Sequence, residues 1–232
     1  SVKEPLNLTV VIPAYNEFHR LASTIEEMVG HLRTAEIRFE ILVSDDGSTD
    51  GTAELVGDLS ERFTEIRLIR NEERRGKGHA VRIGLQEARG DRVLFCDADG
   101  ATPFDQFDLL AVELDNGIDV AIGSRAKKGA GIVWDPRLHR RLLGRVYATL
   151  ISSRLAEGIR DTQCGFKMFS AASAAVVADR LQADGFSFDL EIFIPKIMTM
   201  HAFQFWVQLF KKEQVMQDMT QRYGDTQEQL IV

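Results

Sequence analysis

The sequence predicts an α/β fold in which a mostly parallel sheet is covered by helices on both faces. Two observations carry this prediction. Short apolar runs, of the length of buried strands, recur along the chain, and segments with helical periodicity lie between the first four of them. The runs cover residues 8–12, 39–43, 66–69, 93–96 and 120–122.

Three segments between these runs repeat apolar residues at spacings of three and four, which predicts amphipathic helices. The second segment follows Asp50, a candidate N-cap, and the third follows Gly78. The three apolar faces consist of Leu21, Ile25, Met28 and Leu32; of Leu55, Leu59 and Phe63; and of Ala80, Val81, Gly84, Leu85 and Ala88.

The pattern changes after about residue 124, which predicts a second, different half. A basic loop at 125–131 is followed by a long helical segment at about 136–155, a polar loop at 160–167 and an alanine-rich helix that begins at Ser170. A last apolar stripe has helical spacing, and core packing or a dimer seam explains it better than a membrane contact does. It consists of Ile194, Ile197, Met198, His201, Phe205 and Leu209.

Composition excludes several classes of protein. The net charge of −7 argues against non-specific nucleic-acid binding. Two cysteines are too few for a disulfide framework, so we expect a reducing compartment, and the five histidines lack the spacing of zinc ligands. No apolar run approaches the roughly 18 residues of a membrane span, and residues 1–7 contain no signal-peptide core. We expect a soluble or peripheral protein of the cytoplasm.

Asp97 and Asp99 follow an apolar strand directly and are separated by one residue. In an extended backbone they would point to the same side. Two carboxylates roughly 6 Å apart, at an effective dielectric constant of about 20, repel each other by about 3 kcal/mol. A divalent cation would relieve this repulsion, since Mg²⁺ and Mn²⁺ bind one or two carboxylates together with substrate phosphates. A pair of solvated loop aspartates is the alternative.

Other polar clusters follow the first two strands, at 13–17 and 44–48, and therefore belong to the same edge of the sheet. One of Asp45 and Asp46 is well placed to accept hydrogen bonds from a base or a ribose. An Asx turn with an N-cap explains 47–50 without any ligand.

Basic residues also gather in two places. Residues 74–78, Arg-Arg-Gly-Lys-Gly, precede a predicted helix, whose N-terminus favours an anion. This segment is not a Walker A loop, because Asn71 and Gly78 stand where that motif needs glycine and Ser or Thr. Arg125 follows the fifth apolar run, and the next predicted helix carries Arg137, Arg141 and Arg145 at spacings of four, on one face that could meet a phosphate or an anionic membrane surface. A solvated basic surface is the alternative for both groups.

Six motifs, taken in order, resemble those of the family 2 inverting glycosyltransferases, and most closely the dolichyl-phosphate β-glucosyltransferase branch, near the dolichyl-phosphate mannose synthases. The resemblance covers roughly residues 7–191. The motifs are residues 10–17, 45–48, 76–82, 97–102, 123–125 and 161–167.

This resemblance implies a GT-A fold, with a Rossmann-like sheet, a UDP-sugar donor (most closely UDP-glucose), Mg²⁺ or Mn²⁺, and a polyprenyl phosphate acceptor at the cytoplasmic face of a membrane. Matching positions give the donor-binding candidates Pro13, Tyr15, Glu17, Asp45, Asp46, Lys77, Asp97 and Arg140. The metal candidates are Asp97 and Asp99. The candidates for the reaction centre are Arg125, Asp161, Lys167 and Asp189.

The resemblance also divides the chain. It predicts a glycosyltransferase domain over 1–191, with a nucleotide-sugar-binding half at 1–123 and an acceptor half, partly helical, at 124–191. Residues 192–232 do not follow the family's pattern and are predicted to form a divergent helical tail. Three functions stay open: glucosyl transfer to a polyprenyl phosphate, transfer from another donor such as GDP-mannose or to a hydroxyl acceptor, and nucleotide-sugar binding without transfer. A hydroxyl acceptor would require Asp161 or Asp189 as a general base, whereas an ionised phosphate would not.

Overall fold

The computed structural model describes residues 5–123, 164–185 and 188–192. In chain order, the strands and helices are β1 Leu6–Ala14, α1 Leu21–Thr34, β2 Phe39–Asp45, α2 Thr52–Arg62, β3 Ile66–Arg70, α3 Lys77–Glu87, β4 Gly90–Cys96, the 3₁₀ turn η1 Phe104–Gln106, α4 Phe107–Asp115, β5 Val120–Ile122, β6 Phe166–Ser170, α6 Ala171–Arg180 and α7 Phe188–Glu191.

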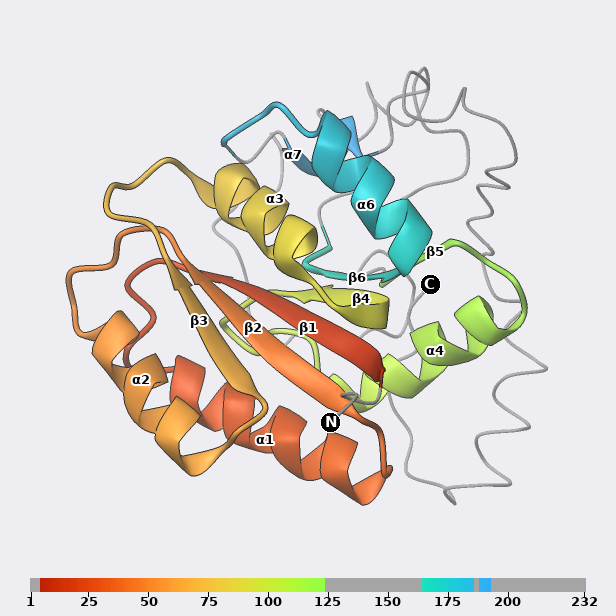
Figure 1. The fold of residues 1–232 in the computed structure, drawn as a ribbon, viewed down its shortest axis with the longest axis horizontal. Helices are drawn as coiled ribbons and strands as arrows, with labels where there is room; N and C mark the ends of the chain where they lie inside the picture. Colours follow the sequence, from red (N-terminus) through yellow and green to blue (C-terminus); the bar gives the residue numbers. More distant parts are fainter. Residues whose placement is uncertain (1–4, 124–163, 186–187, 193–232) are drawn as a thin grey trace, which may run out of the picture.

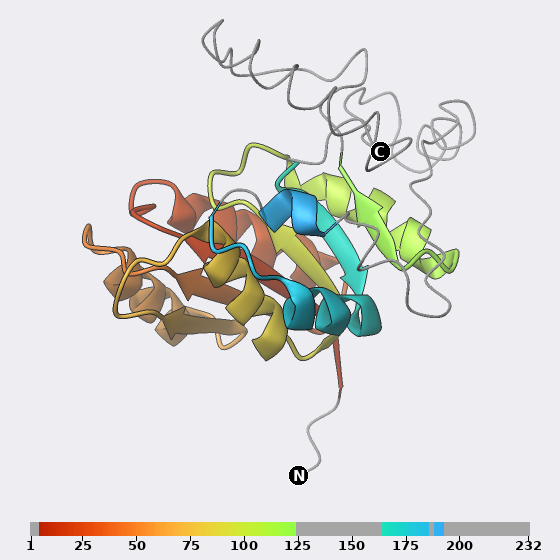
Figure 2. The same cartoon turned by 90° about the horizontal axis from the view of Figure 1, so that it is seen from above.

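The strands form one six-stranded sheet in the order β3-β2-β1-β4-β6-β5. β1, β2, β3 and β4 run parallel, whereas β6 is antiparallel to both of its neighbours. Helices α1, α2 and α4 cover one face, and α3, α6 and α7 cover the other (Figure 1). Figure 2 shows α3 and α6 side by side. The predicted α/β fold with a mostly parallel sheet is confirmed.

The central strands are buried on both faces, which explains why their sequences read as unbroken apolar runs. Val10, Val11 and Ile12 of β1 are fully buried, and so are Ile41 and Val43 of β2. Because both faces must be covered, the amphipathic helices predicted between the strands lie against them. All seven positions of β2 are buried, including its last residue, the first of the Asp45-Asp46 pair.

The structure differs from the prediction at β6 and α4. Residues 160–167 were predicted as a polar loop, but Phe166–Ser170 forms a strand between β4 and β5. The charged residue Lys167 makes this segment resemble a loop in the sequence. In the structure its side chain is fully buried and forms an ion pair with Asp189. The short helix α4 was not predicted either. Helix α6 begins after Ser170 as predicted, and Ser170 caps it.

Candidate functional site

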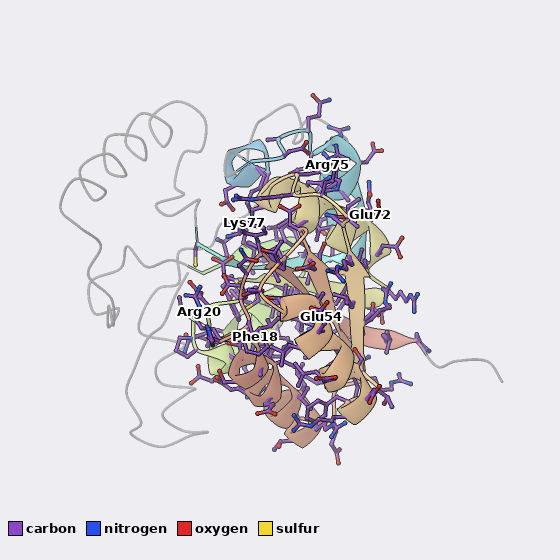
Figure 3. The ribbon with its side chains drawn as sticks, turned by 90° about the vertical axis from the view of Figure 1, so that its left-hand side faces the viewer. Phe18, Arg20, Glu54, Glu72, Arg75 and Lys77 are labelled. Carbon is purple, nitrogen blue, oxygen red and sulfur yellow. The ribbon has the colours of Figure 1, made fainter. Side chains whose placement is uncertain are left out.

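A cavity of about 500 Å³ opens at the carboxyl edge of the sheet, where β1, β2 and β4 end. Figure 3 views this edge and shows Lys77 and Arg75 on the α3 side, with Phe18 and Arg20 on the α1 side. Residues from all three strand ends and from the start of α3 meet in the cavity, as the sequence predicted. Its lining includes Pro13, Tyr15, Glu17, Asp46, Lys77, Asp97 and Asp99.

The loop after β1 is fixed by the loop after β2. The backbone amides of Asn16 and Glu17 donate to the hydroxyls of Ser48 and Thr52, each at 2.9 Å. Asp50 accepts from the amides of Phe18 and Thr52 at 3.2 and 3.0 Å. The N-cap position of α2 is Gly51, so the predicted cap at Asp50 is displaced by one residue. Burial raises the pKa of Asp50, but the hydrogen bonds from the Thr52 hydroxyl and from these amides together outweigh it and hold that pKa below its usual value.

Asp45 and Asp46 have different surroundings. Asp46 lines the cavity, and its two carboxylate oxygens accept from the backbone amides of Arg75 at 2.9 Å and Gly76 at 2.7 Å. Asp45 is fully buried behind it and accepts from the Ser48 amide at 3.2 Å, while its Oδ1 accepts no hydrogen bond. Asp46 therefore fixes the backbone of the basic loop, residues 74–78. Asp45 has one buried carboxylate oxygen without a hydrogen bond.

The basic loop presents side chains to the cavity while its amides are occupied. Two of these amides donate hydrogen bonds to Asp46, and the amides of Gly78 and His79 donate to the Asp184 carbonyl. The anion that we expected at the N-terminus of α3 would thus meet cationic side chains, Arg74 and Lys77, in place of these amides. The Arg74 guanidinium lies 4.1 Å from the centre of the Tyr15 ring, a cation–π contact. The sequence left open whether Arg74 meets an anion or only solvent, and nothing in it signals the stacking on Tyr15.

Asp97 and Asp99 lie in the turn after β4, which ends at Cys96, so strand alternation does not relate them. Both line the cavity. The positive group beside Asp97 is Lys77, whose Nζ lies 2.6 Å from Oδ1. That oxygen is buried and accepts no bond of hydrogen-bonding geometry. Asp99 is exposed and accepts from the Ala101 amide at 3.0 Å.

These two carboxylates fit a divalent cation of the Mg²⁺ type. Asp97 offers a buried oxygen that is paired with the Lys77 ammonium but accepts no hydrogen bond, and Asp99 offers an exposed carboxylate at the same cavity. Among the described residues, no three His, Cys, Asp or Glu side chains gather around one point. Of the described residues, Asp97 and Asp99 would therefore be the ligands, and phosphate oxygens and water would complete the shell, as is usual for Mg²⁺.

A second lysine–aspartate pair lies behind the cavity. Lys167 is fully buried, and its Nζ donates to Asp189 Oδ1 and to the Cys164 carbonyl, both at 2.6 Å. Burial raises the pKa of Asp189, and the Lys167 ammonium opposes that shift. The Nζ atoms of Lys167 and Lys77 lie 5.2 and 5.5 Å from the centre of the Phe95 ring. The two pairs are therefore close neighbours.

Comparison with known proteins decides the family. Residues 9–177 match the family model for Glycosyl transferase family 2. The chain belongs to glycosyl transferase family 2. The resemblance inferred from the six motifs is thereby confirmed.

Two relatives that share one name are similar to most of this chain. The dolichyl-phosphate beta-glucosyltransferase of Drosophila melanogaster is 37% identical over 202 residues, which are 81% of this chain and 61% of the relative. The Homo sapiens protein of that name is 34% identical over 198 residues, 80% of this chain and 61% of the relative. The chain thus spans about three fifths of the length of these relatives.

The fold is also that of solved glycosyltransferases. Glucosyl-3-phosphoglycerate synthase from Mycobacterium tuberculosis, in complex with Mn²⁺, UDP-glucose and phosphoglyceric acid, matches with a TM-score of 0.59 at 20% identity, over 94% of this chain and 66% of that chain. This family 2 chain therefore has the predicted GT-A fold.

Some predicted residues of the family 2 site lie outside the described residues, namely Arg125, Arg140 and Asp161. So do residues 124–163, which are most of the predicted acceptor half, and nearly all of the predicted tail. The structure brings Lys167 and Asp189 together, next to the cavity. In the part of the chain that the structure describes, no helix has the length and apolarity needed to cross a membrane.

Proposed function

We propose that this family 2 protein transfers glucose from UDP-glucose to a polyprenyl phosphate. The observation that carries the proposal is the gathering of Tyr15, Lys77, Asp97 and Asp99 around one cavity at the carboxyl edge of the sheet. The similarity to dolichyl-phosphate beta-glucosyltransferases supports the sugar and the acceptor. Because the acceptor is a lipid, the protein would work at a membrane surface, and we propose its cytoplasmic face.

The donor would lie with its base near Tyr15 and Arg74 and its diphosphate toward Lys77. An aromatic ring and a guanidinium offer flat surfaces to a base, and Arg74 adds donors for its carbonyl groups. Asp97 and Asp99 would hold the divalent cation. When bound, this ion would neutralise the charge that grows on the departing diphosphate. The Lys77 ammonium would add to this stabilisation of the leaving group.

The role of Asp189 depends on whether the acceptor is a phosphate or a hydroxyl group. A phosphate monoester has a second pKa of about 6, so its oxygen is mostly ionised at neutral pH and requires no general base. For this acceptor the Lys167–Asp189 pair would orient groups, and Asp161 would have the same kind of role. A hydroxyl acceptor needs a base, and burial raises the pKa of Asp189 in the direction that suits one. This observation keeps a hydroxyl acceptor as the second candidate.

One assay tests both versions. The protein is incubated with Mn²⁺ and labelled UDP-glucose, with and without a short polyprenyl phosphate, and GDP-mannose serves as the donor control. We expect lipid-extractable label from UDP-glucose that depends on the acceptor. Water-soluble product would favour the hydroxyl acceptor, and tight UDP binding without turnover would mean that transfer is absent. Near-normal lipid transfer by both Asp189→Asn and Asp161→Asn would exclude a general base.

A further inference from the structure

Asp184 joins the acceptor side of the molecule to the first turn of α3. It belongs to residues 181–185, which lead from α6 toward α7. Its backbone carbonyl accepts from the amides of Gly78 at 2.8 Å and His79 at 3.3 Å. These are amides that a helix N-terminus cannot satisfy internally. A backbone carbonyl from more than one hundred residues away in the sequence therefore satisfies two amides in the first turn of α3.

The two glycines beside Lys77 are required by this contact. A side chain at Gly76 would overlap the Asp184 carbonyl, and one at Gly78 would overlap the carbonyl of Ala183. Gly76 also has φ of 121°, which L side chains rarely adopt. The Gly-Lys-Gly sequence thus lets residues 183–185 approach the backbone of α3, a reason for both glycines that does not involve phosphate.

The side chain of Asp184 is held by basic residues of α3 and its preceding loop. Arg82 Nη2 donates to Asp184 Oδ1 at 3.0 Å, and Arg82 Nη1 donates to the Leu181 carbonyl at 3.0 Å. Arg82 Nη2 also lies 2.7 Å from His79 Nδ1, so this nitrogen accepts when His79 is neutral. Arg75 adds a longer ion pair, at 3.6 Å. One guanidinium thus binds both the carboxylate and the backbone of residues 181–185.

This contact fixes two functional groups relative to each other. Lys77 is the first residue of α3 and reaches into the cavity, 2.6 Å from Asp97. Phe188 is fully buried, follows the Asp184 segment, and its ring centre lies 5.9 Å from Lys77 Nζ. Asp189, the partner of Lys167, is the next residue. The distance between the donor lysine and the acceptor-side helix α7 therefore depends on how residues 181–185 sit on α3.

We propose that Asp184 and Arg82 are positioning residues, which hold Lys77 in the donor cavity and the Phe188–Asp189 turn beside it. Neither has to touch a substrate. The contact acts together with Asp46, which holds the amides of Arg75 and Gly76 from the other side. The inference about catalysis rests on the proposed function, whereas the contact itself is tested without it.

Asp184→Ala tests the proposal, with Glu65→Ala as the matched control. Glu65 accepts two bonds from Arg33, at 2.8 and 3.0 Å, and removing it also breaks an exposed carboxylate–arginine pair, away from the cavity. We expect about tenfold faster hydrogen exchange at the Gly78 and His79 amides in Asp184→Ala. We also expect about fivefold weaker binding of UDP with Mn²⁺. Glu65→Ala should change neither.

Two milder variants keep the test decisive if Asp184→Ala folds poorly. Asp184→Asn retains an oxygen that accepts from Arg82 and should show a smaller effect. Arg82→Lys keeps the charge but loses the planar fork that reaches both Asp184 and Leu181, so it should resemble Asp184→Ala. Unchanged exchange at Gly78 and His79 would show that the Arg82–Asp184 pair does not hold residues 181–185 on α3, and faster exchange with unchanged UDP binding and KM would overturn the positioning role. If the wild-type protein binds no UDP, the proposed function is wrong, and exchange alone decides on Asp184.

Discussion

Two lysine–aspartate pairs with the same 2.6 Å separation differ in exposure. The side chains of Lys77 and Asp97 are 25% and 30% exposed, whereas those of Lys167 and Asp189 are 0% and 8% exposed. A partly solvated pair gains little from its attraction, so Lys77 can leave Asp97 for a phosphate at small cost. Removing one partner of a buried pair costs about 3–5 kcal/mol, because it leaves a buried charge alone. We infer that Lys77 is the adjustable cation and Lys167 the fixed one.

Gly165 gives the first prediction at the residue scale. Its carbonyl accepts from the Asp97 amide at 2.9 Å, and a Cβ at this position would overlap the Asp97 carboxylate. Gly165→Ala must therefore displace that carboxylate. We expect at least about tenfold weaker binding of UDP with Mn²⁺, measured by titration calorimetry. Gly30→Ala is the control, since nothing lies within 4 Å of its added methyl group. Equal affinities for the two variants would show that the position of Asp97 does not matter.

His79 gives a prediction about pH. Burial, Arg75 and Arg82 lower its pKa, and Asp184 and Asp46 oppose them. Because the folded pKa lies below the usual value of about 6.5, the unfolded chain binds more protons in mild acid. This contribution to stability is therefore complete above about pH 6.5 and is lost as the pH falls through the folded pKa.

Urea unfolding at pH 7 and pH 5.5 checks this sign. In the wild type, the free energy of unfolding should fall toward pH 5.5, and in His79→Gln it should fall less. His19→Gln, at an exposed loop position, serves as the control and should keep the wild-type pH dependence. Parallel curves for wild type and His79→Gln would contradict the prediction.

At the scale of elements, periodicity predicted the helices that lie against apolar strands and missed β6. Leu21, Ile25 and Met28 are buried on one face of α1, because a helix over a sheet needs such a face. In β6, Lys167 interrupts an apolar run, so the segment reads as a loop. The charge is tolerated because Asp189, in a separate element, neutralises it. A strand that depends on a distant partner leaves no local pattern.

Ser170 gives the prediction at the scale of elements. It ends β6 and caps α6, where its hydroxyl accepts from the Ser173 amide at 3.2 Å and donates to Asp119 at 3.0 Å. Ser170→Ala removes both bonds and should lower stability by about 1 kcal/mol. For a chain of this size, the melting temperature should fall by about 2–4 °C. Ser60→Ala, inside α2, should be neutral or stabilising, since alanine favours the helix interior. Equal melting temperatures for the two variants would refute the role of the cap.

For the whole molecule, the sequence predicted which residues gather at the edge of the sheet. It did not predict which groups each of them binds. Three strand ends of a parallel sheet share an edge, so Pro13, Asp46 and Asp97 had to be neighbours. Whether a carboxylate faces ligand or protein depends on contacts between separate loops. Asp46 accepts hydrogen bonds from amides of the basic loop. The Asp184 carbonyl, distant in the sequence, accepts from amides in the first turn of α3. Neither contact has a signature in spacing or composition.

A ligand in the cavity should stabilise the whole molecule, because the cavity is built from three strand ends and α3. A ligand at about 100 times its Kd adds about 2.7 kcal/mol, which corresponds to about 5–10 °C in melting temperature for a chain of this size. We expect this rise with UDP and Mn²⁺ together, and a much smaller one with either alone. Asp99→Asn should lose the part that depends on Mn²⁺, whereas Asp58→Asn, at an exposed position of α2, should keep it. If UDP alone gave the full rise, or if Asp99→Asn responded as the wild type does, Asp99 would not hold the metal that joins the nucleotide to the sheet edge.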